Sequence, residues 1–159
     1  MARPPLPPWA ARYGAIPWRE HGRDHAGCDC WGLYRLILGE QTGIWLPSHD
    51  EVYARALDGH AVAAAVACHG TAAPEWNEVP AGAERTFDAV LMRLGYPRDG
   101  GGAAYADAHV AMVLVPGFLI HIEADPDGGA GAGVTVRAYR DDIRINRRVR
   151  QFYRHAGLS

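Results

Sequence analysis

The stretch GCDCWGLYRLILGE, residues 27–40, marks the start of a helix whose first turn carries a cysteine. From Cys30 onward, apolar residues recur at the spacing of one helix face, and Asp29 is placed to cap the first turn. Gly39 and Gly43 indicate where the helix ends. A thiol in the first turn meets free backbone N–H groups and the positive end of the helix dipole, which favour a thiolate. Cys30 is therefore the candidate nucleophile, and its own N–H is a candidate oxyanion donor.

The size and charge of the chain limit the function classes to consider. Its 159 residues suit one domain, and a formal net charge of −2 does not indicate a nucleic-acid partner. Arginines cluster only in residues 144–154, where we expect a solvated basic face, although a phosphate-facing role stays open. The N-terminus has no long apolar run, so we expect no secretory signal and no membrane span, and synthesis in the cytoplasm.

The order of the expected elements predicts the fold class α+β. The first half is helical, with one or two further helices expected within residues 48–70. The second half has short β-rich runs, which favour an antiparallel sheet with the helices packed on one face. The strands are expected in residues 87–94, 109–115, 118–124 and 134–140. Segments 96–108 and 125–133 are expected to be flexible connectors, the first a mobile flap or a partner-binding loop.

The two ends of the chain complete the expected domain organisation. Residues 1–12 contain the Pro-rich run RPPLPPW and are expected to be an extended arm, either loose or laid on a partner. Residues 13–159 are expected to form a single domain.

Two histidines are candidates for the base that a nucleophilic cysteine needs. His109 opens one expected strand and His121 lies within the next. A tight turn at Pro116–Phe118 would join these strands in a hairpin and bring the two imidazoles close. One ring would then be the base and the other its orienting partner. Glu123 lies on the same strand face as His121 by alternation and is a possible further partner of the pair.

These residues resemble the NlpC/P60 family of cell-wall peptidases. The family's nucleophile core, Asp-Cys-small-Gly-Leu at a helix start, is similar to residues 29–33, and its trailing Leu-Pro matches Leu46 and Pro47. RTFDAVLM, residues 85–92, resembles a family strand, with Phe87 where glycine is usual. HVAMVLVPGFLIHIEA, residues 109–124, resembles the stretch that carries the catalytic histidine and the third catalytic residue.

The resemblance implies a papain-like fold, in which the nucleophile helix packs on a central antiparallel sheet, and a triad of Cys30, His109 and His121. Trp18 stands where many members have a tyrosine near the nucleophile, and Trp31 replaces a common serine. With Asp29, these two tryptophans form the expected substrate-binding and oxyanion side. No cofactor and no metal are implied. The implied activity is that of a cysteine peptidase on peptidoglycan stem peptides, at the bond between D-glutamate and diaminopimelate or a close neighbour.

The variant PWREHGRDHAGCDCWGL, residues 17–33, is most similar to the branch of the family found in phage tails and gene transfer agents. That branch implies a protein carried on a tail tip, with hub, baseplate and tip proteins as partners. It would act on the cell wall or in the periplasm of the target cell.

Two alternatives accompany this interpretation. His21, His25, Cys28 and Cys30 are metal-ligand types within ten residues, so a small zinc site is one alternative. Cys28 and Cys68 are otherwise expected to be small packed residues. The last alternative concerns function: the protein is chiefly a structural component of a baseplate, with weak or lost hydrolase activity.

Overall fold

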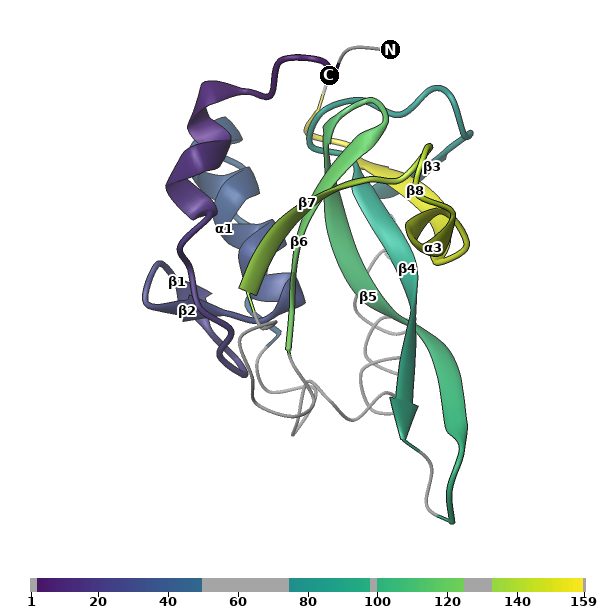
Figure 1. The fold of residues 1–159 in the computed structure, drawn as a ribbon. Helices are drawn as coiled ribbons and strands as arrows, with labels where there is room; N and C mark the ends of the chain where they lie inside the picture. The colour runs from purple at the N-terminus through teal and green to yellow at the C-terminus, as the bar shows by residue number, and fades with distance from the viewer. Residues whose placement is uncertain (1–2, 50–74, 98–99, 125–132, 159) are drawn as a thin grey trace.

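The computed structural model describes residues 3–49, 75–97, 100–124 and 133–158. It is an α+β structure built on a six-stranded antiparallel sheet with the strand order β3-β8-β4-β5-β6-β7 (Figure 1). The predicted fold class is confirmed. The strands are β3 (Trp76–Val79), β4 (Ala89–Pro97), β5 (Ala103–Val115), β6 (Phe118–Glu123), β7 (Gly133–Ala138) and β8 (Val149–His155).

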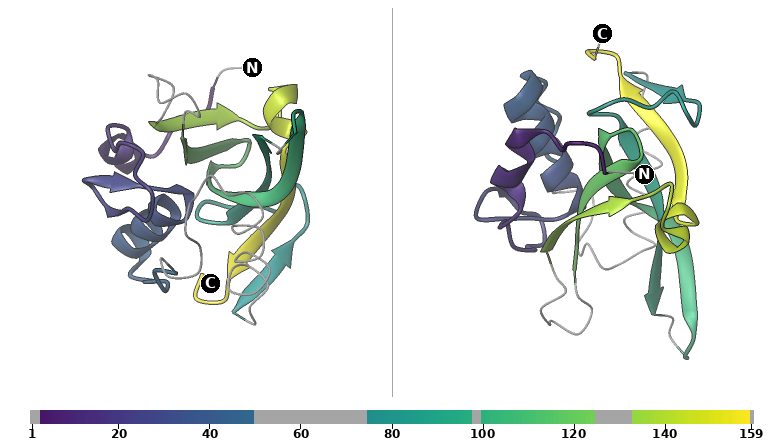
Figure 2. Two further views of the ribbon diagram at one scale, coloured as in Figure 1. Left: turned by 90° about the horizontal axis from the view of Figure 1, so that it is seen from below. Right: turned by 45° about the horizontal axis from the view of Figure 1, so that its top comes forward.

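The expected nucleophile helix is α1, Cys30–Thr42, and it packs on β5 and β6. It ends at Gly43, whose left-handed φ of 79° suits a glycine C-cap, as the sequence predicts. Both views of Figure 2 place α1 on the same side of the sheet as the 3-10 helix η1 (Pro8–Tyr13) and the small hairpin of β1 (Arg23–Asp24) and β2 (Gly27–Cys28). The short helix α3 (Ile143–Asn146) precedes β8.

Each face of the sheet buries its own apolar cluster. One cluster joins α1, η1 and the side chains of Val110, Met112, Ile120 and Ile122. The other contains the side chains that point to the opposite face of these strands, Ala111, Val113 and Leu119, together with Ile145 of α3. Burial on both faces explains why the β5 and β6 sequences are nearly continuous apolar runs rather than alternating ones.

The N-terminal segment differs from the extended arm that was expected. Residues from Pro8 to Tyr13 form η1, because proline suits the first position of a helical turn. Trp9 stacks on Phe87 with ring centroids 5.5 Å apart, and Tyr13 is fully buried. Trp9 thus packs against the core, and Ala10 and Tyr13 are part of it.

The segment 96–108 also differs from expectation. Ala103–Ala108 belong to β5 and continue its pairing with β4 as far as Pro97↔Ala103, so this segment is mostly strand and not a flexible connector. The hairpin projects beyond the rest of the sheet in Figure 1. Arg93 lies over the ring of Tyr105, 4.9 Å from its centroid, which adds a contact between the two strands that small alanines cannot supply.

Sequence analysis missed the strands β3 and β8. The region expected to be a solvated basic face contains β8, which lies between β3 and β4 in the sheet. The guanidinium of Arg154 binds both carboxylate oxygens of the buried Asp88, at 2.8 and 2.6 Å. The Arg-rich composition of this region does not indicate a strand, because the partners that neutralise its arginines are distant in sequence.

Two further expectations concern helices. Apart from Ser48 and His49, the helices expected within residues 48–70, and Cys68, lie outside the described residues. Within the described part of the chain, none of the helices combines the length and apolar character needed to cross a bilayer.

Candidate active site

The start of α1 is held by the carboxylate of Asp29. This fully buried side chain accepts a hydrogen bond from the N–H of Gly32 at 2.8 Å, which confirms the predicted N-cap. It also binds the Arg23 guanidinium at 2.7 Å and the backbone N–H of His21 at 3.1 Å. These contacts position the residue that follows, Cys30. The assignment of Asp29 to the substrate-binding side stays a prediction.

The first turn of α1 also packs closely against the backbone of the loop before β1. A Cβ at Gly32 would lie 1.9 Å from the carbonyl oxygen of Gly22, so only glycine allows the helix to come this near to the loop before β1. Arg23 donates to that same carbonyl at 2.9 Å while it holds Asp29. The loop, the cap and the helix start therefore form one rigid unit.

The Cys30 thiol lies against β5. The backbone N–H groups of Val110 and Trp31 are within hydrogen-bonding reach of its sulfur. The ladder between β5 and β6 ends at Met112↔Ile120, two residues short of Val110, so the Val110 backbone is not paired with β6 there. The thiol thus lies beside the residue that directly follows His109 in the sequence.

The expectation of a stabilised thiolate is not met in this structure. Burial, and then the negative charge of Asp29, raise the pKa of the Cys30 thiol to about 12. The N–H groups of Val110 and Trp31 and the charge of Arg23 lower it, but they do not offset the loss of solvation. Cys30 is therefore a neutral thiol near pH 7 and needs a base to become a nucleophile.

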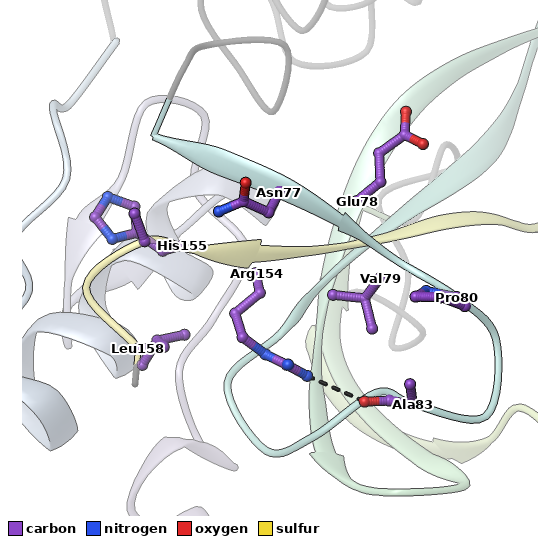
Figure 3. A pocket seen from close by; sticks show the side chains of 9 residues that line it. Asn77, Glu78, Val79, Pro80, Ala83, Arg154, His155 and Leu158 are labelled. Atoms are coloured by element: carbon purple, nitrogen blue, oxygen red, sulfur yellow. Dashed lines mark hydrogen bonds between the residues drawn. The ribbon is translucent and has the colours of Figure 1, made fainter.

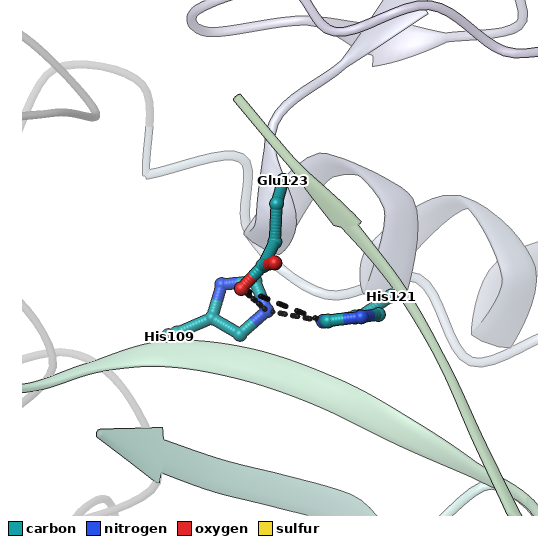
Figure 4. Close-up of side chains that lie close together, drawn as sticks. All are labelled: His109, His121 and Glu123. Atoms are coloured by element: carbon teal, nitrogen blue, oxygen red, sulfur yellow. Dashed lines mark hydrogen bonds and ion pairs between the residues drawn. The ribbon is translucent and has the colours of Figure 1, made fainter. Parts of the chain in front are cut away.

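His109 and His121 lie together as the hairpin prediction requires. Figure 4 shows the two rings, from β5 and β6, with Glu123 beside them. His109 Nε2 and His121 Nδ1 are 2.9 Å apart, and both side chains are almost fully buried. Their catalytic roles stay predictions.

Both imidazoles are uncharged near neutral pH. Burial, with the repulsion of His121, lowers the pKa of His109 to about 3. Burial also lowers the pKa of His121 to about 4, with Glu123 acting in the opposite direction. A neutral ring keeps a lone pair, which is what a general base needs.

The contact between the rings determines which atom of His109 is left for Cys30. Because Nε2 is engaged with His121, only Nδ1 remains to accept a proton. No hydrogen bond joins Cys30 to either histidine among the described residues. Hydrogen bonds of this kind are commonly long or poorly aligned before substrate binds.

The helix start also retains an unused donor. Among the residues that the structure describes, none accepts a hydrogen bond from the backbone N–H of Cys30. The first N–H groups of a helix have no partner within the helix, and the role of this group as an oxyanion donor stays a prediction.

Glu123 and Arg148 extend the histidine pair, and Arg148 was missed by sequence analysis. Glu123 Oε1 lies 3.9 Å from both His109 Nε2 and His121 Nδ1, and Arg148 forms an ion pair with the same oxygen. Burial alone would raise the pKa of Glu123, but His109 and Arg148 outweigh it and lower the pKa to about 2. An ionised carboxylate therefore faces both rings. Arg148 is 25 residues away along the chain, and no local pattern indicates this pairing.

The two tryptophans of the expected substrate side occupy different positions. Trp31 is half-buried beside Cys30; its indole N–H donates to the Pro47 carbonyl at 3.0 Å, and its ring stacks on Tyr34. Trp18 pairs through its backbone with Cys28 and packs against the α1 cluster. Their contact with substrate stays a prediction.

The structure does not gather the alternative zinc ligands near the cysteines. His25 binds Glu40 at 2.8 Å, and the buried Cys28 donates to the Asp24 carbonyl at 3.2 Å. In the described ranges, the group of potential ligands that converges is instead His109, His121 and Glu123.

A separate cavity of about 330 Å³ lies beside β3 and β8 and does not include the candidate catalytic residues (Figure 3). Arg154 crosses it and donates to the Ala83 carbonyl at 3.1 Å. Its lining residues are Asn77, Glu78, Val79, Pro80, Ala83, Arg154, His155, Ala156 and Leu158. Arg154 also holds the buried Asp88, so its position in the cavity is explained by the fold.

Neither the models of known protein families nor the curated proteins match this chain. Among solved structures, the chain is similar to one described as the NlpC/p60 domain of the peptidoglycan hydrolase SagA. The identity is 21% and the TM-score 0.45, over 82% of this chain and 83% of that chain. At this level the similarity carries no argument about function, which must come from the residues described above.

Proposed function

We propose that this protein is a cysteine peptidase that hydrolyses peptidoglycan stem peptides. The observation that carries the proposal is the meeting of two segments distant in sequence. Cys30, at the first turn of α1, lies close to the backbone N–H of Val110, the residue after His109 of the buried His109–His121 pair. The similarity of residues 29–33 to the NlpC/P60 nucleophile motif supports the choice of substrate class.

The ring contact sets the proton positions that the reaction needs. In the proposed tautomer, His109 carries its proton on Nε2 and donates it to Nδ1 of His121, 2.9 Å away, which leaves His109 Nδ1 with a lone pair for the Cys30 proton. The imidazolium that then forms is stabilised by the Glu123 carboxylate. His121 thus keeps His109 in the productive tautomer. Because His121 is neutral, the negative charge that stabilises the imidazolium comes from Glu123.

The chemistry proceeds through a thioester. His109 takes the thiol proton as the sulfur of Cys30 attacks a peptide carbonyl, and the oxyanion binds the N–H of Cys30. The C–N bond breaks, and His109 returns the proton to the leaving amine. Water then gives a proton to His109 and attacks the thioester, which releases the carboxylic acid and restores the thiol.

The finer parts of the proposal rest on the sequence resemblance. The bond cleaved is that between D-glutamate and diaminopimelate, or a close neighbour. The protein is made in the cytoplasm, docks on hub or baseplate proteins of a phage or gene-transfer-agent tail, and opens the cell wall locally during entry. An affinity pulldown of this protein from purified particles tests the docking, since tail proteins should be recovered with it. If the protein is absent from such particles, it has no tail role.

The test of the enzyme uses purified sacculi and an analysis of the muropeptides released. We expect Cys30→Ala to reduce release by at least about a thousandfold, since the nucleophile is lost. Cys28→Ala is the matched control, because that thiol lies two residues away but is buried beside β1. Equal release by wild type and Cys30→Ala would overturn the assignment of Cys30.

A second candidate function is that of a structural tail component with weak or lost activity. The observation that favours it is the raised pKa of Cys30, together with the lack of a hydrogen bond from this thiol to either histidine in the described residues. Iodoacetamide titration separates the two functions. A peptidase shows a selectively reactive Cys30 whose rate falls in His109→Asn, whereas a scaffold shows no histidine-dependent reactivity.

A further inference from the structure

Three metal-ligand atoms converge at the histidine pair, and they do not include His109 Nδ1, the atom proposed to accept the Cys30 proton. His109 Nε2, His121 Nδ1 and Glu123 Oε1 all lie within 4.8 Å of one another. The two nitrogens are 2.9 Å apart, and each is 3.9 Å from the carboxylate oxygen. The three atoms come from the neighbouring strands β5 and β6, just beyond the end of their ladder at Met112↔Ile120.

The spacing suits a zinc ion with a small adjustment of the side chains. Zinc binds imidazole nitrogen at about 2.0–2.1 Å and is usually tetrahedral, so two ligand atoms on one ion lie about 3.3 Å apart. The nitrogens must separate by about 0.4 Å and the carboxylate must approach by about 0.6 Å to reach that value. Rotation of rings and carboxylate supplies such shifts without moving the strands.

The surroundings keep the donors in the form that binds metal. Burial keeps both imidazoles uncharged, and neutral imidazole is the form that ligates zinc. Glu123 is about one-third exposed, which leaves a path for an ion and a place for water as the fourth ligand.

Arg148 opposes the ion. Its guanidinium forms an ion pair with Glu123 Oε1, the same atom that would bind the metal, and its charge acts on both histidines. Zinc must displace this guanidinium from the carboxylate. Removal of the Arg148 charge should therefore strengthen metal binding rather than weaken it.

We propose that His109, His121 and Glu123 form a zinc-binding site that switches the hydrolase off. Zinc on His109 Nε2 uses the lone pair of that nitrogen, so the ring proton moves to Nδ1. Nδ1 then has no lone pair with which to accept the Cys30 proton. The ion is thus an inhibitor and not a cofactor; the inhibitory effect rests on the proposed function, whereas the binding site does not.

The test of the site measures zinc binding alone, by calorimetry and by metal analysis after dialysis, on the full chain. Cys30→Ala serves as the background, so that the thiol does not contribute. We expect one zinc per chain, an affinity at least tenfold lower in Glu123→Gln and in His121→Asn, and a higher affinity in Arg148→Gln. His25→Gln is the matched control on the surface and should bind zinc as the parent does.

The Arg148→Gln variant distinguishes a direct effect on the site from an effect on folding, because a misfolded protein would lose zinc affinity and not gain it. Circular dichroism checks each variant. Absence of zinc uptake at micromolar free metal would overturn the site, as would binding that is unchanged in Glu123→Gln or lost in His25→Gln.

Hydrolysis of sacculi by the protein with its native Cys30 is the second measurement, with and without zinc and then after chelation. Reversible loss of hydrolysis supports the switch, and full activity with zinc bound overturns it. If zinc binds but no hydrolysis occurs at any metal level, the site stands and the proposed function fails. If hydrolysis occurs but no zinc binds, the site alone fails.

Discussion

At the residue scale, Asp29 has a structural task that its place in the motif does not reveal. Its carboxylate caps α1 and neutralises Arg23 in a buried position. We expect Asp29→Ala to lower the free energy of unfolding by about 3–5 kcal/mol, because it removes the cap and takes the paired carboxylate away from a largely buried guanidinium that keeps its contacts with Ser48 and Gly22. Urea denaturation measures the change.

Asp142 provides the comparison for this prediction. It caps α3 through the N–H of Arg144, but it and its ion-pair partners are more exposed. We expect Asp142→Ala to cost about 1 kcal/mol, the usual value of a cap. Equal losses in the two variants would contradict the view that the buried pair with Arg23 dominates at Asp29.

The buried histidines predict how stability depends on pH. Burial lowers the pKa of His109 and His121 from 6.5 to about 3 and about 4, whereas the unfolded chain protonates near 6.5. Stability is therefore complete above pH 6.5 and is lost as pH falls from there toward the folded-state values. Each histidine should lower the free energy of unfolding by about 2 kcal/mol as the pH falls from 6.5 to 5, at about 1.4 kcal/mol per pH unit.

Urea denaturation between pH 7.5 and pH 5 tests the slope. This window lies above the range where Glu123 loses its contribution, since its pKa falls from 4.5 to about 2. His121→Asn should show a shallower dependence than wild type. Ile122→Val is the control for destabilisation as such and should keep the wild-type slope. A wild-type protein equally stable at both ends of the window would rule out buried, neutral imidazoles.

At the element scale, the start of α1 depends on glycine for packing rather than for helix formation. Alanine normally stabilises a helix interior by about 1 kcal/mol relative to glycine. At Gly32 the added Cβ would meet the Gly22 carbonyl oxygen at 1.9 Å. We expect Gly32→Ala to destabilise the protein by about 1–3 kcal/mol and to lower activity by displacing Cys30. Thermal unfolding and muropeptide release measure the two effects.

Gly14→Ala, at the C-terminal end of η1, is the matched control for Gly32→Ala. Gly14 has a helical φ of −64°, and the nearest atom to an added Cβ is 3.6 Å away. We expect stability and activity close to those of wild type. A stable and active Gly32→Ala protein would show that the loop at Gly22 moves freely.

Elements defined by local patterns were predicted well. The cap at Asp29, the glycine stop at Gly43 and the hairpin through Gly117 all follow from residues a few positions apart. The 3-10 helix η1 and the outer half of β5 were not predicted, because proline, glycine and alanine are typical of loops. Contacts with distant partners, such as Trp9 on Phe87, decide their conformation.

At the scale of the whole molecule, the C-terminal strand completes the sheet that carries the histidines. β8 pairs with β3 on one side and β4 on the other, and Arg154 neutralises the buried Asp88. A chain that ends at residue 142 would leave that carboxylate and the β4 edge without partners. We expect it not to fold cooperatively, as measured by near-UV circular dichroism and thermal unfolding.

Removal of residues 1–5 is the control for truncation. It spares η1, which begins at Pro8, and removes only the Arg3 contact with the Phe118 ring among the described residues. We expect unfolding close to that of wild type. Cooperative unfolding of the chain that ends at residue 142 would show that β8 is an accessory strand.

The sequence by itself determined the α+β class, the helix that begins at Cys30 and the pairing of His109 with His121. Each depends on caps, turns and periodicity, which act over a few residues, and the twelve-residue separation of the histidines allows one hairpin to join them. Only the tertiary structure decided the rest. It placed the thiol against Val110, raised the pKa of Cys30, and brought Arg148 to Glu123. Burial and charge pairing depend on which distant segments meet in space, and no local pattern contains that information.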